Sequence, residues 1–182
     1  MAGGLKEVRE RIKSVISTQQ ITKAMKMVSA AKLRKAQTAI VQMRPYTERL
    51  NRMLSNILSN LDGDATTSFG KARKVKNALV VVVTSNRGLC GAFNTNINKE
   101  AIAHIDAKYA ELRRDGKVTV LFIGKKGFDY FRRRFRDLQF NTEFIGLFEK
   151  LEYDLTSPVA RQLMNEFSSG KYDAIDIVYG RF

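Results

Sequence analysis

The residues best able to do chemistry in this chain of 182 residues stand in one short segment, SNRGLCGAFN, from Ser85 to Asn94. The segment follows a continuous apolar run, VKNALVVVVTS, which predicts a strand buried on both faces. It precedes a predicted helix, and α/β proteins usually bind ligands at such strand-to-helix loops. The loop contains two glycines, the cation of Arg87 and the only cysteine of the chain, Cys90. Phosphate binding and thiol catalysis are therefore the two chemistries to test.

Neither chemistry has its full set of residues. The glycine spacing is neither GxGxxG nor that of a Walker lysine loop. Cys90 has no obvious base, because the only histidine, His104, falls in the middle of a predicted helix, where we expect an ordinary surface or partly buried side chain. The sequence has no CxxC or HExxH motif and no paired-carboxylate constellation. We therefore predict no catalytic residue, no metal and no cofactor. We interpret the loop as a turn or docking surface that consists of Arg87, Gly88, Leu89, Cys90 and Gly91.

The segments around this loop alternate between strand and helix. Strands are predicted over residues 75–85, 117–124, 138–145 and 172–182, and helices over residues 95–114, 125–135 and 157–167. The last helix opens with Ser157 and Pro158, a favourable N-cap and first-turn pair. The alternation predicts a Rossmann-like, mostly parallel α/β domain over residues 75–182.

A long helix is predicted over residues 1–61, followed by a loop over residues 62–74. From Leu5 to Asp62 the sequence has no glycine and is dominated by good helix formers. Pro45 is the one proline of this stretch, and because the apolar pattern continues through it, we predict a kink rather than a stop. The helix would be about 85 Å long, which is more than a globule of this size could cover.

Apolar residues repeat along this helix with heptad spacing, which is typical of a coiled-coil seam. Twelve of seventeen seam positions are apolar: Leu5, Val8, Ile12, Val15, Leu33, Ala36, Ile40, Met43, Leu50, Leu54, Ile57 and Leu61. The pattern is interrupted within residues 19–32, where the seam positions are Gln19, Thr22, Lys26 and Ser29. The apolar residues of that stretch have moved to neighbouring faces, so a single apolar stripe does not describe it.

Positive charge is concentrated on the same helix. The whole chain has a formal net charge of +14, and residues 1–61 hold twelve Lys and Arg against three Glu. No acidic residue lies between Glu10 and Glu48. We therefore expect an acidic partner for this helix.

The seam also needs a partner helix, because apolar surface left in water costs about 25 cal/mol per Å². No second long periodic helix is predicted in residues 62–182. Either another protein supplies the partner, or the chain is a fragment whose partner helix lies beyond Phe182, and the ending on a strand favours the fragment. The sequence has neither a signal peptide nor an apolar run that could span a bilayer, and its single cysteine suits a reducing compartment.

A second basic segment, FRRRFRD at residues 131–137, combines arginines with aromatic residues. Together with the basic helix it suggests an alternative class, a basic coiled-coil protein that binds nucleic acid. In zipper proteins the basic region lies beside the seam, whereas here the basic residues are interspersed along it. We therefore expect no nucleic-acid partner and a solvated cationic face at residues 131–137. A Rossmann-like enzyme is a further alternative, which a nucleotide would stabilise.

Three stretches, residues 17–37, 44–46 and 84–94, resemble the gamma subunit of F-type ATP synthase, and so does the opening MAGGLKEVRERIKSV. The resemblance runs across the whole chain and has one departure. The family's second long helix, which is C-terminal and pairs antiparallel with the first, is missing here. That helix would be the partner that the seam requires.

The resemblance implies a rotor shaft in the central stalk. In the family, the coiled coil stands inside a ring of three alpha and three beta subunits, and the α/β domain lies beside the epsilon subunit and the membrane ring of c subunits. Proton flow turns the c-ring and shaft, which drives rotary ATP synthesis or hydrolysis at the beta subunits. The family's gamma subunit has no active site of its own. Because the chain lacks the plastid-type insertion with paired cysteines, the resemblance favours a peripheral subunit on the cytoplasmic face of a bacterial plasma membrane.

The resemblance also implies which side chains of the shaft meet the beta subunits. They are Lys23, Met25, Lys26, Met27 and Val28. The two lysines would face an acidic loop of the beta subunits, and the methionines would offer contacts that can be remade at each rotary step. A shaft inside a ring has several neighbours, which would explain why the apolar residues leave the seam within residues 19–32.

Overall fold

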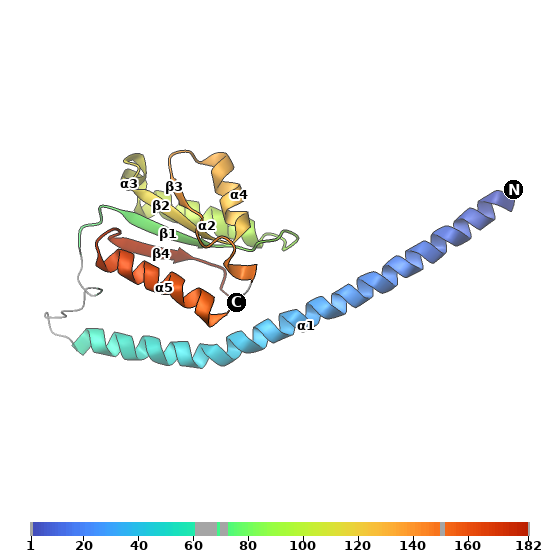
Figure 1. Cartoon of the computed structure of the whole chain (residues 1–182), viewed down its shortest axis with the longest axis horizontal. Coiled ribbons are helices and arrows are strands. Elements are labelled where there is room, and N and C mark those ends of the chain that lie inside the picture. Colours follow the sequence, from blue (N-terminus) through green and yellow to red (C-terminus); the bar gives the residue numbers. More distant parts are fainter. Residues whose placement is uncertain (1, 61–68, 70–72, 150–151, 182) are drawn as a thin grey trace. The chain divides into compact units, whose positions relative to one another are not determined.

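The computed structural model of the chain describes residues 2–60, 69, 73–149 and 152–181 (Figure 1). The chain divides into two compact units, Met1–Ala65 and Thr66–Phe182. The first unit contains the long helix and the second contains the α/β domain, so the predicted fold class is confirmed. Most of the loop predicted over residues 62–74 lies outside the described residues, and its boundaries stay a prediction.

Helix α1 runs from Ala2 to Asn60 without a break. Its 59 residues correspond to a length of about 90 Å at 1.5 Å per residue. Pro45 lies inside the helix, where it has no N–H to donate and its ring crowds the carbonyl of Val41. Figure 1 shows α1 changing direction between its blue and cyan ends, in line with the predicted kink. The last predicted seam position, Leu61, lies outside the described residues.

The α/β domain contains one sheet of four parallel strands. The strands are β1 (Ala78–Val83), β2 (Val118–Ile123), β3 (Gln139–Asn141) and β4 (Ala174–Val178). Their order in the sheet is β3-β2-β1-β4, and every pairing is parallel. The carboxyl ends of β1 and β2 therefore lie side by side, and the loop after β1 starts at this edge.

Side chains of β1 alternate between two apolar cores, which explains its continuous apolar sequence. Ala78, Val80 and Val82 face helices α2 (Phe93–Lys108) and α4 (Lys125–Arg134). Leu79 and Val81 face the opposite side, which α5 (Tyr153–Ser168) covers (Figure 1). Both faces of β1 are buried, because helices pack on each side of a parallel sheet.

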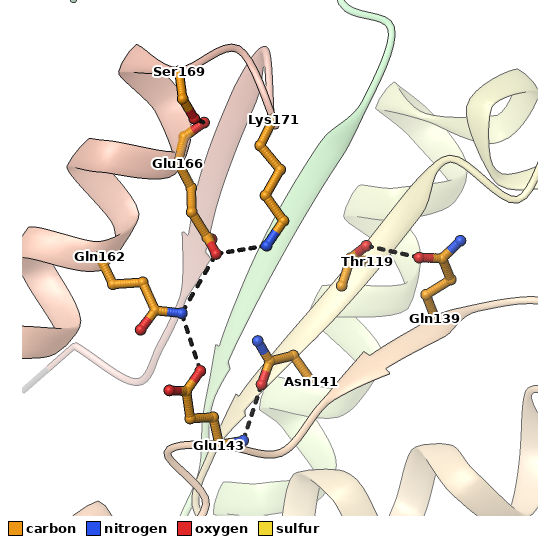
Figure 2. Close-up of polar contacts among 8 residues, drawn as sticks. All are labelled: Thr119, Gln139, Asn141, Glu143, Gln162, Glu166, Ser169 and Lys171. Atoms are coloured by element: carbon orange, nitrogen blue, oxygen red, sulfur yellow. Dashed lines mark hydrogen bonds and ion pairs between the residues drawn. The ribbon is translucent and has the colours of Figure 1, made fainter.

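Polar contacts at the end of β3 hold α5 in place, as Figure 2 shows. Gln162 Nε2 donates to Glu143 Oε2 at 3.0 Å and lies 3.4 Å from Glu166 Oε1. Lys171 follows α5 in the chain, and its Nζ pairs with the same Glu166 oxygen at 2.6 Å. Helix α5 is therefore tied to the chain after β3 as well as to the sheet.

Besides β4, which covers Ala174–Val178 where residues 172–182 were predicted, three predicted elements differ from the structure. The helix predicted over residues 95–114 is broken at Tyr109 (φ −128°, ψ 24°) into α2 and α3 (Ala110–Arg114), because Tyr109 is buried and its hydroxyl donates to Asp176. The strand predicted over residues 138–145 shortens to Gln139–Asn141 and is followed by a 3₁₀ turn at Leu147–Glu149. Both differences arise from tertiary contacts that periodicity does not report.

The third difference is the start of α5. The predicted cap at Ser157 is wrong, because the helix begins at Tyr153 and its N-cap residue, Glu152, has an extended backbone. Pro158 therefore lies inside the helix rather than in its first turn. Its missing N–H leaves the carbonyl of Asp154 without a helical donor, and Asp154 is exposed, so water can replace that bond.

Candidate functional site

The loop after β1 is clipped to the start of α4. The first three N–H groups of α4 donate to this loop. The Lys125 N–H donates to Asn86 Oδ1 at 3.1 Å, and the Lys126 N–H donates to the Ser85 carbonyl at 3.1 Å. The Gly127 N–H donates to Thr84 Oγ1 at 2.8 Å. A helix N-terminus binds phosphate through such N–H groups, and here they are already engaged. The N-terminus of α4 is therefore occupied by the loop after β1.

The other end of the loop is held by Asn94, in the first turn of α2. Its Oδ1 accepts a hydrogen bond from the Ser85 N–H at 3.0 Å, and its Nδ2 lies 2.9 Å from Ser85 Oγ. The same Nδ2 lies 3.1 Å from Cys90 Sγ, and Ser85 Oγ lies 3.9 Å from that sulfur. An amide and a hydroxyl are not bases at neutral pH, so these neighbours do not activate the thiol as a nucleophile.

The loop residues between Asn86 and Asn94 face solvent. All five predicted docking residues, Arg87, Gly88, Leu89, Cys90 and Gly91, are exposed. Leu89 is fully exposed and has a positive φ of 61°, a left-handed conformation that costs a residue with a Cβ about 1–2 kcal/mol. An apolar side chain held outward on a strained backbone is typical of a contact site for another protein.

Gly124 is a residue of this site that sequence reasoning missed. It precedes α4 and has φ 104°. A Cβ added there would lie 2.0 Å from the backbone oxygen of Thr84, so only glycine allows β1 and β2 to end this close together. A glycine at the end of a predicted strand, directly before a predicted helix, was the available signal.

The predicted shaft residues of α1 are all exposed but fall on two sides of the helix. At about 100° per residue, Lys23, Lys26 and Met27 share one side. Met25 and Val28, which are 65% and 56% exposed, share the other. The structure therefore does not bring the five residues into one patch, and a single neighbour could not contact all of them.

The heptad seam of α1 is exposed along its described length. Its large apolar side chains are between 41% exposed, at Leu50, and 65% exposed, at Leu5. At two polar seam positions, the side-chain hydroxyl already donates a hydrogen bond within the helix. Thr22 Oγ1 donates to the Thr18 carbonyl at 2.8 Å, and Thr47 Oγ1 donates to the Met43 carbonyl at 3.2 Å. A partner could cover these threonines without leaving a buried donor unpaired.

A second polar cluster joins α2 to β4 around Asp176. His104 Nε2 and Lys108 Nζ each lie 2.8 Å from Asp176 Oδ2, and the Tyr109 hydroxyl donates to the same oxygen at 2.6 Å. Burial opposes ionisation of Asp176, but the hydrogen bonds from these three side chains outweigh it and lower its pKa to about 2. His104 is thus a partly buried structural residue, as predicted, whereas its partners were not predicted.

In the described parts of the chain, no group of three or more His, Cys, Asp or Glu side chains is arranged to hold a metal ion. Over the same residues, no helix combines the length and apolar character that crossing a membrane requires.

Comparison with known proteins places these features in a family. A family model described as ATP synthase matches residues 4–182. The ATP synthase gamma chain of Cytophaga hutchinsonii is 49% identical over 98% of this chain and 60% of its own length. The gamma chain of Flavobacterium psychrophilum is 47% identical over 98% of this chain and 59% of its own. A solved chain titled Euglena gracilis mitochondrial ATP synthase, OSCP/F1/c-ring, is 26% identical, with a TM-score of 0.48, over 91% of this chain and 49% of that chain.

The described structure combines a long, basic, heptad-patterned helix of the coiled-coil type with a parallel α/β domain. The family match is more specific: the chain belongs to the ATP synthase family and is similar to its gamma chains. It spans about 60% of the length of the curated relatives that it matches.

Proposed function

We propose that this chain acts in the central-stalk rotor of an F-type ATP synthase, where it couples proton translocation through the membrane ring to ATP synthesis and hydrolysis at the alpha-beta ring. The observation that carries the proposal is the exposed heptad seam on a basic helix of 59 residues. Membership of the family supports it. A second long helix covers the seam, and the helix of the family's C-terminal part is the expected partner.

The two sides of α1 near residue 25 have different neighbours in this proposal. Lys23 and Lys26 face the acidic loops of the beta subunits, with Met27 on the same side of the helix. Met25 and Val28, on the opposite side, contact a second neighbour within the ring. Exposed charge pairs contribute at most about 1 kcal/mol each, so these contacts favour one rotary position without locking the shaft.

The α/β domain serves as a docking base in the same assembly. The exposed loop of residues 87–91 is its main contact site, and the epsilon subunit and the c-ring are its further partners. The chain is non-catalytic in this proposal: the first N–H groups of α4 are engaged by acceptors of the loop after β1, and the Cys90 thiol lies beside an amide and a hydroxyl. It is peripheral, on the cytoplasmic face of a bacterial plasma membrane.

Co-expression of the chain with the alpha and beta subunits, and with a separate segment that carries the C-terminal helix of a related gamma chain, tests the proposal. The chain should co-purify with both subunits. Ile40→Asp, at a seam position, should reduce recovery because it places a charge against the partner helix. Val41→Asp is the matched control, since Val41 is adjacent, exposed and off the seam, and it should leave recovery unchanged.

Two results would contradict the proposal. One is failure of the unaltered chain to co-purify with alpha and beta subunits. The other is tight binding to duplex DNA with a steep dependence on salt, which would favour the alternative of a nucleic-acid-binding coiled coil.

A further inference from the structure

A cluster of arginines at the C-terminal end of α4 is not used by the shaft or by the docking loop. Four arginines occur within five residues, and all are exposed: Arg132, Arg133, Arg134 and Arg136. We call them the arginine surface. Since adjacent Cα atoms lie 3.8 Å apart, the four side chains start within about 15 Å of one another, which is the length of a short peptide segment.

Two of these guanidinium groups are oriented by their surroundings. The guanidinium carbon of Arg134 lies 4.0 Å from the centre of the Tyr130 ring. That of Arg132 lies 5.4 Å from the Phe128 ring centre, and its Nη2 pairs with Asp129 Oδ1 at 3.0 Å. Such stacking reduces the conformational entropy that the side chains lose when they bind a ligand.

The other two cations have no carboxylate partner in the described part of the chain. The nearest acidic residues in sequence are Asp129, which pairs with Arg132, and Asp137, which pairs with Arg113 of α3. Arg133 and Arg136 are therefore available for an external anion.

The surroundings favour carboxylates of a protein over a membrane or a nucleic acid. A membrane-surface helix needs an exposed apolar face, but Phe131 is fully buried, and Phe128 and Phe135 are largely packed against the domain. Single-stranded nucleic acid needs free aromatic faces for stacking, and Arg134 covers one face of Tyr130. Arginine binds a carboxylate through two parallel hydrogen bonds, which suits an acidic peptide segment.

We infer that the arginine surface at the C-terminal end of α4 docks an acidic segment of a partner protein through Arg133 and Arg136, with Arg132 and Arg134 as oriented cations on either side of Arg133. The inference does not depend on the shaft function, because the surface lies in the α/β domain and its test requires no alpha or beta subunit.

Fluorescence anisotropy with a labelled twelve-residue peptide that carries glutamate at alternate positions tests this inference on the full chain. Its counterpart with glutamine at those positions should not bind. Arg133→Gln/Arg136→Gln should weaken binding of the acidic peptide by about fivefold, since exposed pairs contribute up to about 1 kcal/mol each. Arg133→Lys/Arg136→Lys keeps the charge and loses the two-bond geometry, and should still weaken binding by about threefold.

The matched control removes the same charge from α1. Arg9→Gln/Arg11→Gln alters two exposed arginines of the basic helix and should change peptide affinity less than twofold. An equal loss in both variants would mean diffuse attraction to a basic chain and would overturn the inference. It would also be overturned if duplex DNA or phosphatidylglycerol vesicles bound more tightly than the peptide and lost that binding in Arg133→Gln/Arg136→Gln.

Discussion

Replacement of Gly124 by alanine measures how strongly the docking loop is clipped to the α/β domain. Two costs add in this variant. The first is the backbone cost of φ 104° for a residue with a Cβ, about 1–2 kcal/mol. The second is the collision of the new Cβ with the Thr84 backbone oxygen, 2.0 Å away, which forces a backbone shift worth about 2 kcal/mol more. We expect the free energy of unfolding of the domain to fall by about 3–4 kcal/mol.

Urea denaturation provides the assay. Unfolding of the α/β domain can be followed by the near-ultraviolet circular dichroism of its buried tyrosines, Tyr109 and Tyr172. For a slope of about 2 kcal/mol per molar urea, the midpoint should fall by roughly 1.5–2 M.

Gly116→Ala is the matched control for the collision. Gly116 also has a positive φ, 66°, but a Cβ there would meet nothing within 4 Å. This control should show only the backbone cost, a midpoint shift of about 0.5–1 M. If Gly124→Ala and Gly116→Ala shifted the midpoint equally, the reasoning about the contact between Gly124 and Thr84 would be refuted.

The remaining predictions concern the shaft, the thiol and acid stability. Met25→Lys should leave ATP hydrolysis by the assembled complex largely intact and reduce proton-coupled synthesis, and an equal fall in both rates would contradict a coupling role. Cys90→Ser should retain activity after reconstitution, and loss of turnover with intact assembly would revive a catalytic thiol. Because the folded pKa of Asp176, about 2, lies below the ordinary value near 3.9, its contribution to stability is complete above about pH 4 and is lost as the pH falls toward 2. Asp176→Asn should therefore lower the urea midpoint at neutral pH and flatten its decline between pH 4 and pH 2, and an unchanged slope would contradict this role.

Patterns of apolar residues predicted most of the fold. The long helix follows from an uninterrupted run of good helix formers, and its passage through Pro45 follows from a heptad pattern that continues on both sides. The four strands and their parallel arrangement follow from short apolar runs that alternate with helical segments. These features depend on residues close in sequence, so periodicity reports them.

Elements whose ends depend on distant partners were predicted less well. Tyr109 leaves the helix because its hydroxyl reaches Asp176, which is 67 residues away in the sequence. Helix α5 begins before the expected cap at Ser157, because local capping preferences contribute only about 1 kcal/mol and packing on the sheet outweighs them.

The sequence by itself determined the long helix and the composition of the loop after β1, because both depend on residue types and spacing along the chain. Only the tertiary structure decided that the N-terminus of α4 is occupied by the loop, since the acceptors on Thr84, Ser85 and Asn86 reach α4 through the parallel pairing of β1 and β2. The fold also decided that Gly124 must be glycine. A hydrogen bond or a collision between segments some forty residues apart has no periodic signal, so it becomes visible only when the sheet has brought those segments together.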